Sequence, residues 1–368
     1  MHLLRVVNAL DRVGFSPLVA VAQPGGTYEA ALAEDVPVYS LNPAGIGSST
    51  MRMVRAVRPL RQLIQAHRPD LVCSVMDHAN LAAILACRGL PQRPRLVVCT
   101  QNSPLAQYGR PWHPLDRLVL AGMARLYPQA DRIVALSEGV AAEVQSLVNR
   151  PRTSPAPPIE VIYNAGVDAA VKRGGREGLM LRQGQTPRLP LLVACGRLHP
   201  QKGYPYLLEA LARVRQTLPV QLWIVGEGPL RPVLERQIQR LGLTNAVQLL
   251  GFRANPYQYM AAADLFVLPS LYEGFGNVIV EAMACGTPVL ATDCPHGPAE
   301  ILEQGKHGLL VPPANAEALA QGILSLLQNP ALREQYGRCG LTRSLDFQAD
   351  AIAGHYATMF NAVLAAPH

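Results

Sequence analysis

Glu273-Gly-Phe-Gly-Asn-Val-Ile-Val-Glu281 and Gly196-Arg-Leu-His-Pro-Gln-Lys-Gly203 are the two stretches that decide the fold of this chain. Each follows a short apolar run and leads into a helical pattern. A short apolar run that ends in a glycine-containing turn before a helix is typical of a buried parallel strand. Since the same succession recurs along the chain, we expect an α/β protein with parallel sheets.

Apolar runs of this kind occur in both halves of the sequence and alternate with helical periodicity. The predicted strands are residues 17–22, 71–75, 95–100 and 132–136, followed by 189–195, 220–225, 246–250, 264–268 and 288–291. Alternating strands and helices favour doubly wound sheets. We therefore predict two doubly wound, Rossmann-like α/β domains.

A proline-rich segment, residues 151–158, and a polar, glycine-rich segment, residues 172–187, separate the two halves. Neither is expected inside a helix or strand. We predict an N-terminal domain over residues 1–165, a linker over 166–187 and a second domain over 188–345. Residues 346–368 should form a helix that returns toward the N-terminal domain.

The composition excludes several classes of protein. The chain has 368 residues, 49% of them hydrophobic, and lacks an apolar run of the roughly 18–20 residues that a membrane span requires. Its seven cysteines are scattered without a Cys-x-x-Cys pair, which disfavours a metal site or a disulfide framework and favours the cytoplasm. The net charge of +7 attracts phosphates, acidic lipids or nucleic acid without choosing among them.

Four arginines, at positions 52, 55, 58 and 61, recur every third residue. On a helix they would form a stripe, although Pro59 is expected to disturb it. The stripe has two interpretations: a contact with a membrane surface or a lipid diphosphate, or a solvated face.

The turn over residues 196–203 has the features of an anion site. A turn from a strand into a helix presents backbone N–H groups at the edge of the sheet, and Arg197 and Lys202 add two charges. Charge-assisted hydrogen bonds contribute about 1.5–3 kcal/mol each, more than a helix terminus alone. The alternative is that both are solvated loop charges.

The turn over residues 273–281 has the features of a site for a sugar and a ribose. Gly274 and Gly276 allow a ligand close to the backbone. Glu273 lies on the loop, where it can accept hydrogen bonds from hydroxyl groups. Glu281 lies about one turn into the helix, where it can bind two ribose hydroxyls; alternatively, it is an acid favoured by the helix dipole.

Together the two turns resemble the donor-binding motifs of the retaining glycosyltransferases of the GT-B fold, family 4. The pattern there is Gly-Arg-Leu…Gln-Lys-Gly, then Glu-Gly-Phe-Gly with a second Glu eight positions after the first. The segments between them are similar too, among them residues 225–229, 250–252 and 262–264. The strong resemblance covers about residues 160–330.

The resemblance implies a role for each matching residue. Arg197 and Lys202 would bind the donor diphosphate and act with Glu273 as the catalytic residues. Glu273 would hold the transferred sugar and Glu281 the ribose. The remaining donor-binding residues would be Phe252 and Arg253 near the base, and Gly274, Phe275, Gly276 and Asn277.

The resemblance also implies that the two Rossmann-like domains face each other across a cleft, and it implies the reaction. A sugar would pass from a nucleotide-sugar such as a UDP- or GDP-sugar to a glycan or lipid-linked acceptor, with retention of configuration, without a metal ion or cofactor. The setting would be polysaccharide or glycolipid synthesis in the cytoplasm, with a peripheral contact to an anionic membrane and no nucleic acid partner.

Two departures from the family pattern lie in the first half. Gln101-Asn102 stands where many members have a histidine near the sugar, while His78 and His113 are interpreted as surface or packing residues. The sequence also begins within what resembles the family's first helix, which predicts an N-terminal domain without its first strand and glycine-rich loop.

Two rival functions stay open at this point. One is an epimerase or phosphorylase on the same architecture; the other is a non-catalytic protein that binds nucleotide sugars. A dehydrogenase is excluded, because Gly226-Glu-Gly228 continues to Arg231 where a dinucleotide fingerprint requires its third glycine.

Overall fold

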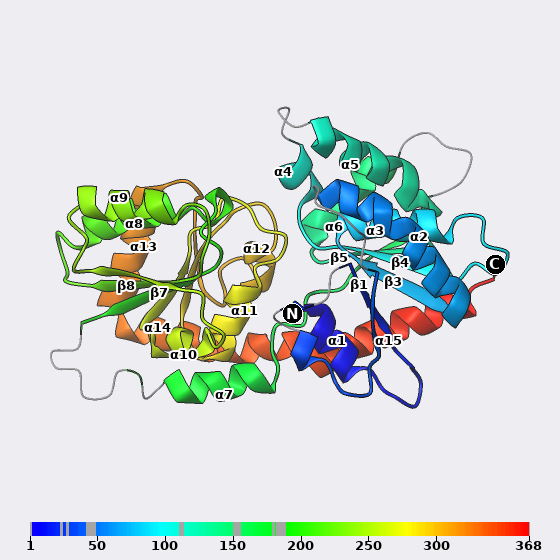
Figure 1. Ribbon diagram of the computed structural model, residues 1–368. Coiled ribbons are helices and arrows are strands. Elements are labelled where there is room, and N and C mark those ends of the chain that lie inside the picture. The colour runs from blue at the N-terminus through cyan, green and yellow to red at the C-terminus, as the bar shows by residue number, and fades with distance from the viewer. Residues whose placement is uncertain are drawn as a thin grey trace. The chain divides into compact units, whose positions relative to one another are not determined.

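The computed structural model describes residues 2–22, 25–26, 29–41, 49–109, 114–149, 156–178, 181 and 189–367. The chain divides into two compact units. The first unit is Met1–Ala165 with Ala349–His368, and the second unit is Gly166–Gln348. Each contains a parallel sheet covered by helices (Figure 1).

The second unit has a six-stranded parallel sheet in the order β12-β11-β10-β7-β8-β9. Its strands are β7 (Leu191–Cys195), β8 (Gln221–Val225), β9 (Val247–Gly251), β10 (Leu265–Leu268), β11 (Val289–Thr292) and β12 (Leu309–Val311). The chain starts in the middle at β7, winds outward to β9, and returns to β10 beside β7. This is the Rossmann strand order, and β7/β10 is its topological switch point.

Helices cover both faces of this sheet. They are α8 (Tyr204–Val214), α9 (Arg231–Arg240), α10 (Tyr257–Ala262), α11 (Asn277–Ala284), α12 (Pro298–Ile301), α13 (Ala316–Gln328) and α14 (Pro330–Ser344), with the 3-10 turns η3 (Pro200–Lys202) and η4 (Leu345–Phe347). Apolar residues of α8, α9 and α13 form one core with β7, β8 and β10. Every residue of β10 and β11 is buried, as expected for strands covered on both sides.

The first unit has a four-stranded parallel sheet in the order β3-β4-β5-β6 and a separate parallel pair, β1-β2. The strands are β1 (Val19–Val21), β2 (Val38–Ser40), β3 (Leu71–Val75), β4 (Arg95–Thr100), β5 (Arg132–Ala135) and β6 (Ile159–Val161). The helices are α1 (His2–Ala9), α2 (Ser49–His67), α3 (Asp77–Cys87), α4 (Pro104–Tyr108), α5 (Pro114–Leu126), α6 (Glu138–Val148) and α15 (Ala349–Ala365), with the 3-10 turns η1 (Glu29–Ala31) and η2 (Tyr127–Gln129).

Helices from the two ends of the sequence lie side by side in the first unit. Helix α15 packs against α1, and both share a core with β4 and β5 (Figure 1). The residues that α15 buries are Ile352, Ala353, Tyr356, Met359, Phe360 and Val363. The last helix is therefore part of the first unit.

The predicted fold class is confirmed: both units are parallel α/β structures. Each of the nine predicted strands contains or overlaps an observed strand, with ends that differ by at most two residues. The strands that the sequence did not predict, β2, β6 and β12, have three residues each. Three residues are too few to show a hydrophobic period; β1 has the same length but was predicted because it lies within a longer apolar run, residues 17–22.

Two local predictions are wrong. Residues 166–187 are not simply a linker, since α7 (Ala169–Gly178) lies there and packs against α10. Its glycines serve close packing: a Cβ on Gly178 would lie 2.2 Å from the Gln258 carbonyl oxygen. Helix α2 also continues past Pro59, so the proline does not end the helix. Residues 151–155 and 182–187 lie outside the described part.

Candidate active site

The candidate site lies at the carboxyl edge of the second unit's sheet, at its switch point. The turn that contains Arg197 and Lys202 follows β7, and the turn that contains Glu273 follows β10. Because β7 and β10 are parallel neighbours, both turns leave the same edge of the sheet. Ligands of open α/β sheets bind in the crevice at such a point.

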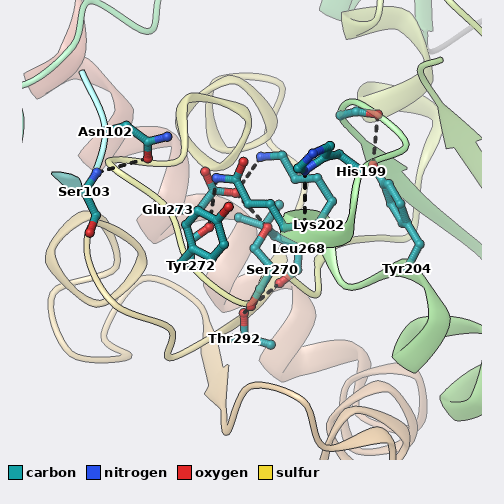
Figure 2. Close-up of polar contacts among 12 residues, drawn as sticks. Asn102, Ser103, His199, Lys202, Tyr204, Leu268, Ser270, Tyr272, Glu273 and Thr292 are labelled. Carbon is teal, nitrogen blue, oxygen red and sulfur yellow. Dashed lines mark hydrogen bonds and ion pairs between the residues drawn. The ribbon is translucent and has the colours of Figure 1, made fainter. Parts of the chain in front are cut away.

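Lys202 and Glu273 meet there. Lys202 Nζ donates to Glu273 Oε1 at 2.5 Å, and the side chains are 14% and 7% exposed (Figure 2). Ser270 Oγ donates to the same oxygen at 2.6 Å. A cation and an anion that the sequence separates by seventy-one residues thus form one buried polar group.

The two turns are also joined through their backbones. Leu271 N donates to the Gln201 carbonyl oxygen at 2.8 Å, and Gln201 Nε2 donates to the Tyr272 carbonyl oxygen at 3.0 Å. Gly203 has φ 62°, and a Cβ there would lie 2.0 Å from the Pro269 carbonyl oxygen. The close approach of the turns therefore requires glycine at position 203.

A third segment, which begins at the last residue of β11, supports the Glu273 turn. Thr292 Oγ1 donates to the Ser270 carbonyl oxygen at 2.5 Å, and Glu273 N donates to the Pro295 carbonyl oxygen at 2.8 Å. The loop that carries Glu273 is thus held from both neighbouring strands. Such fixed loops can present a side chain in one orientation.

The surrounding thiols are neutral. Burial first, and then the Glu281 carboxylate, raise the pKa of Cys195 to about 12. Burial first, and then the Glu273 carboxylate, raise the pKa of Cys294 to about 12. A thiol with so high a pKa is a poor nucleophile, so cysteine chemistry is not expected here.

Arg197, Phe252 and Arg253 are exposed at the same edge of the sheet. The Arg197 guanidinium has no hydrogen bond or ion pair with any described residue. Phe252 and Arg253 follow the end of β9, and the Phe252 side chain is 57% exposed. An exposed aromatic ring and an uncommitted cation are available to a ligand.

The other predicted residues lie on the turn before α11 and on that helix. Gly274 to Gly276 are buried, and Gly276 caps α11 with φ 102°. The Phe275 ring packs edge-on against Phe347, with centroids 5.6 Å apart, so this ring is part of the core. Asn277 opens α11, and its buried Oδ1 has no hydrogen-bond partner among the described residues. Glu281 is the fifth residue of α11 and is buried.

The sequence did not single out Ser270, Gln201 or Thr292. Their contacts join segments that follow different strands, and no local spacing reveals which strands are neighbours. One feature of the sequence could have pointed to Ser270: this hydroxyl residue stands three residues before Glu273 on the same turn.

At the carboxyl edge of the first unit's sheet, Asp77 lies in a polar network. Tyr127 OH donates to Asp77 Oδ1 at 2.9 Å, and Asn80 Nδ2 donates to the Tyr127 oxygen at 2.9 Å. Burial raises the pKa of Asp77 to about 6, partly offset by the hydrogen bond from Tyr127. The carboxyl group therefore titrates close to neutrality.

The histidines and amides of the first unit make local contacts. The His78 ring lies edge-on to Tyr108, with Nδ1 3.4 Å from the Tyr108 hydroxyl oxygen. Asn102 Nδ2 donates to Gln107 Oε1 at 3.0 Å. His113 lies outside the described residues. Among the residues described, no three His, Cys, Asp or Glu side chains gather closely enough to hold a metal ion.

Two family profiles match the chain. Residues 1–170 match the profile described as Glycosyltransferase Family 4, and residues 189–329 match the one described as Glycosyl transferases group 1.

A similar protein of Campylobacter jejuni is N-acetylgalactosamine-N,N'-diacetylbacillosaminyl-diphospho-undecaprenol 4-alpha-N-acetylgalactosaminyltransferase. It is 32% identical over 279 residues, which are 76% of this chain and 72% of the relative.

Two solved structures are similar to the present one. The sucrose-phosphate synthase of Thermosynechococcus elongatus has a TM-score of 0.84 and 22% identity, over 99% of this chain and 92% of the other. HepE of Anabaena, solved with UDP and glucose, has a TM-score of 0.76 and 27% identity, over 94% and 91%.

Proposed function

This chain belongs to glycosyltransferase family 4 and is a glycosyltransferase, and on that premise we propose that its donor is a nucleoside-diphosphate sugar bound at the carboxyl edge of the second unit. The observation that carries the proposal is the contact of Lys202 with Glu273 at the β7/β10 switch point. It brings a cation for phosphate and a carboxylate for hydroxyl groups to one place.

The diphosphate would be bound by Arg197 and Lys202. Arg197 is exposed and Lys202 is partly accessible beside Glu273. Phosphate oxygens accept charge-assisted hydrogen bonds from both side chains. The same charges would stabilise the diphosphate as it leaves the sugar, so no metal ion or further cofactor is required in the proposal.

The donor's other parts match the remaining groups. Glu273 would accept hydrogen bonds from the transferred sugar and Glu281 from the ribose. The exposed Phe252 ring offers a face for the base, with Arg253 beside it in sequence. The similarity to HepE, which was solved with UDP and glucose, supports a UDP-sugar as the first donor to try. Retention of configuration rests on the family resemblance.

The acceptor would be a glycan or a lipid-linked sugar in polysaccharide or glycolipid synthesis. The Campylobacter relative acts on a diphospho-undecaprenol-linked sugar.

The arginines of α2 bear on a contact with the membrane. Arg55 and Arg58 are exposed, while Arg61 Nη1 donates to the Arg88 carbonyl oxygen at 3.0 Å. No helix within the described ranges has the length and apolar character of a membrane span. We therefore propose a peripheral contact of Arg55 and Arg58 with anionic lipid at the cytoplasmic face of the membrane.

A panel of nucleotide sugars tests the proposal. The purified chain is mixed with UDP- and GDP-sugars, with and without a diphospho-polyprenol-linked sugar, and release of UDP or GDP is measured. We expect turnover with at least one donor, undiminished by EDTA, and an α-linked product from an α-linked donor by NMR. Binding of nucleotides without turnover of any donor would contradict the proposed reaction.

A further inference from the structure

Ser270 is buried next to Glu273 and is held by hydrogen bonds of its backbone and its side chain. It is the second residue after β10 and is fully buried. Its carbonyl oxygen accepts from Thr292 Oγ1 at 2.5 Å, and its hydroxyl donates to Glu273 Oε1 at 2.6 Å. The serine therefore links the end of the neighbouring strand β11 to the Glu273 carboxylate (Figure 2).

The two contacts of the Glu273 carboxylate fall on one oxygen. Ser270 Oγ and Lys202 Nζ both donate to Oε1. Within the described part of the chain, no donor forms a hydrogen bond with Oε2. An ionised carboxylate only accepts hydrogen bonds, so Oε2 is the oxygen that stays available to a hydroxyl donor.

The lysine alone does not fix the carboxylate. An ammonium group is a point charge on a flexible stem, and it attracts the carboxylate in many orientations. Ser270 is different, because its backbone is anchored and its hydroxyl is a single directed donor. A binding group needs such support to stay in productive geometry.

We propose that Ser270 is a positioning residue for Glu273: it holds Oε1 toward Lys202 and so presents Oε2 to a hydroxyl of the donor sugar. This inference rests on the proposed function. A serine that only satisfies a buried carboxylate would stabilise the fold without affecting the sugar step, and the experiment separates these roles.

The experiment is a double-mutant cycle of Ser270→Ala and Glu273→Gln in the full chain. UDP affinity is measured by calorimetry, and kcat and KM are measured with the donor found in the nucleotide-sugar panel. We expect Ser270→Ala to leave UDP affinity within twofold and to lower kcat at least tenfold. In the Glu273→Gln background, the same change should lower kcat less than twofold. Equal losses in both backgrounds would overturn the proposal.

Two further measurements guard against a trivial loss of folding. Ser344→Ala is the matched control, because this serine is also buried in the second unit and its hydroxyl donates only to a local carbonyl, that of Leu341 at 2.7 Å. Its kcat should not change. Ser270→Thr keeps the hydroxyl and should recover at least a third of wild-type kcat; no recovery, with UDP affinity unchanged, counts against the proposal.

The cycle also works without turnover, which separates failure of this inference from failure of the proposed function. If no nucleotide sugar reacts with the wild type, the function is wrong. The contact between Ser270 and Glu273 is then tested by urea unfolding, where the two changes should couple at least fivefold in the unfolding constant. Coupling below fivefold would overturn the positioning role whether or not the enzyme is active, because that role requires the contact.

Discussion

At the scale of single residues, the ion pair of Lys202 and Glu273 is the feature with most consequence for binding. Both side chains are largely buried, and they form an ion pair with each other. Removing one partner of such a pair leaves an uncompensated charge and commonly costs 3–5 kcal/mol. Variants at the two positions should therefore affect binding and stability in different ways.

Lys202→Ala should weaken UDP binding about 10- to 100-fold, because one charge-assisted phosphate contact of about 1.5–3 kcal/mol is lost. Glu273→Gln should leave UDP affinity equal or higher, since the carboxylate no longer competes for the lysine. Calorimetry measures both. Lys306→Ala is the control, because this exposed lysine pairs with Glu303 away from the site. Unchanged affinity in Lys202→Ala would refute the diphosphate assignment.

Asp77 predicts a pH dependence of stability. Its pKa is raised from 3.8 to about 6, so the folded state keeps a proton that the unfolded state has lost. The free energy of unfolding should thus fall as pH rises from about 4 to about 6, and Asp77 should cause no further fall well above pH 6. Asp77→Asn should remove this fall and stabilise the protein by about 3 kcal/mol at pH 7. Urea unfolding at pH 4, 5, 6 and 7 measures it; parallel curves for both proteins would exclude Asp77 as the source.

At the scale of elements, the packing of α7 on α10 depends on missing side chains. A Cβ on Gly178 would lie 2.2 Å from the Gln258 carbonyl oxygen and 2.7 Å from Ala261 Cβ. Gly178→Ala should therefore force the helices apart and cost about 1–3 kcal/mol in urea unfolding. Gly354→Ala on α15 is the control, because its Cβ would meet nothing within 4 Å. That change should stabilise by about 0.5–1 kcal/mol.

The helices and strands also show which parts of the fold could be predicted from the sequence. Long apolar runs such as β4 and β10 were predicted because burial on both faces leaves a continuous hydrophobic signal. The glycines of α7 were misinterpreted as a linker, because composition does not distinguish flexibility from close packing. Lys202 and Glu273 were each selected from local motifs, whereas their contact and the part of Ser270 depend on which strands are neighbours.

At the scale of the whole molecule, the last helix completes the first unit. Six side chains of α15 are buried in the core shared with α1, β4 and β5. A chain that ends at Gln348 should therefore lose protection of amide hydrogens in β3 to β6 and keep it in β7 to β12. Hydrogen exchange read by mass spectrometry measures both sets of peptides. Equal protection of β3 to β6 with and without α15 would show that the helix is dispensable.

The discontinuous first unit has a consequence for synthesis on the ribosome. Residues 1–165 emerge from the ribosome before residues 349–368, yet residues 349–368 supply part of their core. The second unit is one continuous segment and has all its strands as soon as β12 has emerged. Domains of a nascent chain commonly fold in order from the N-terminus. Here the order should be reversed: the unit with the candidate donor site is completed before residues 349–368 have emerged to complete the core of the first unit.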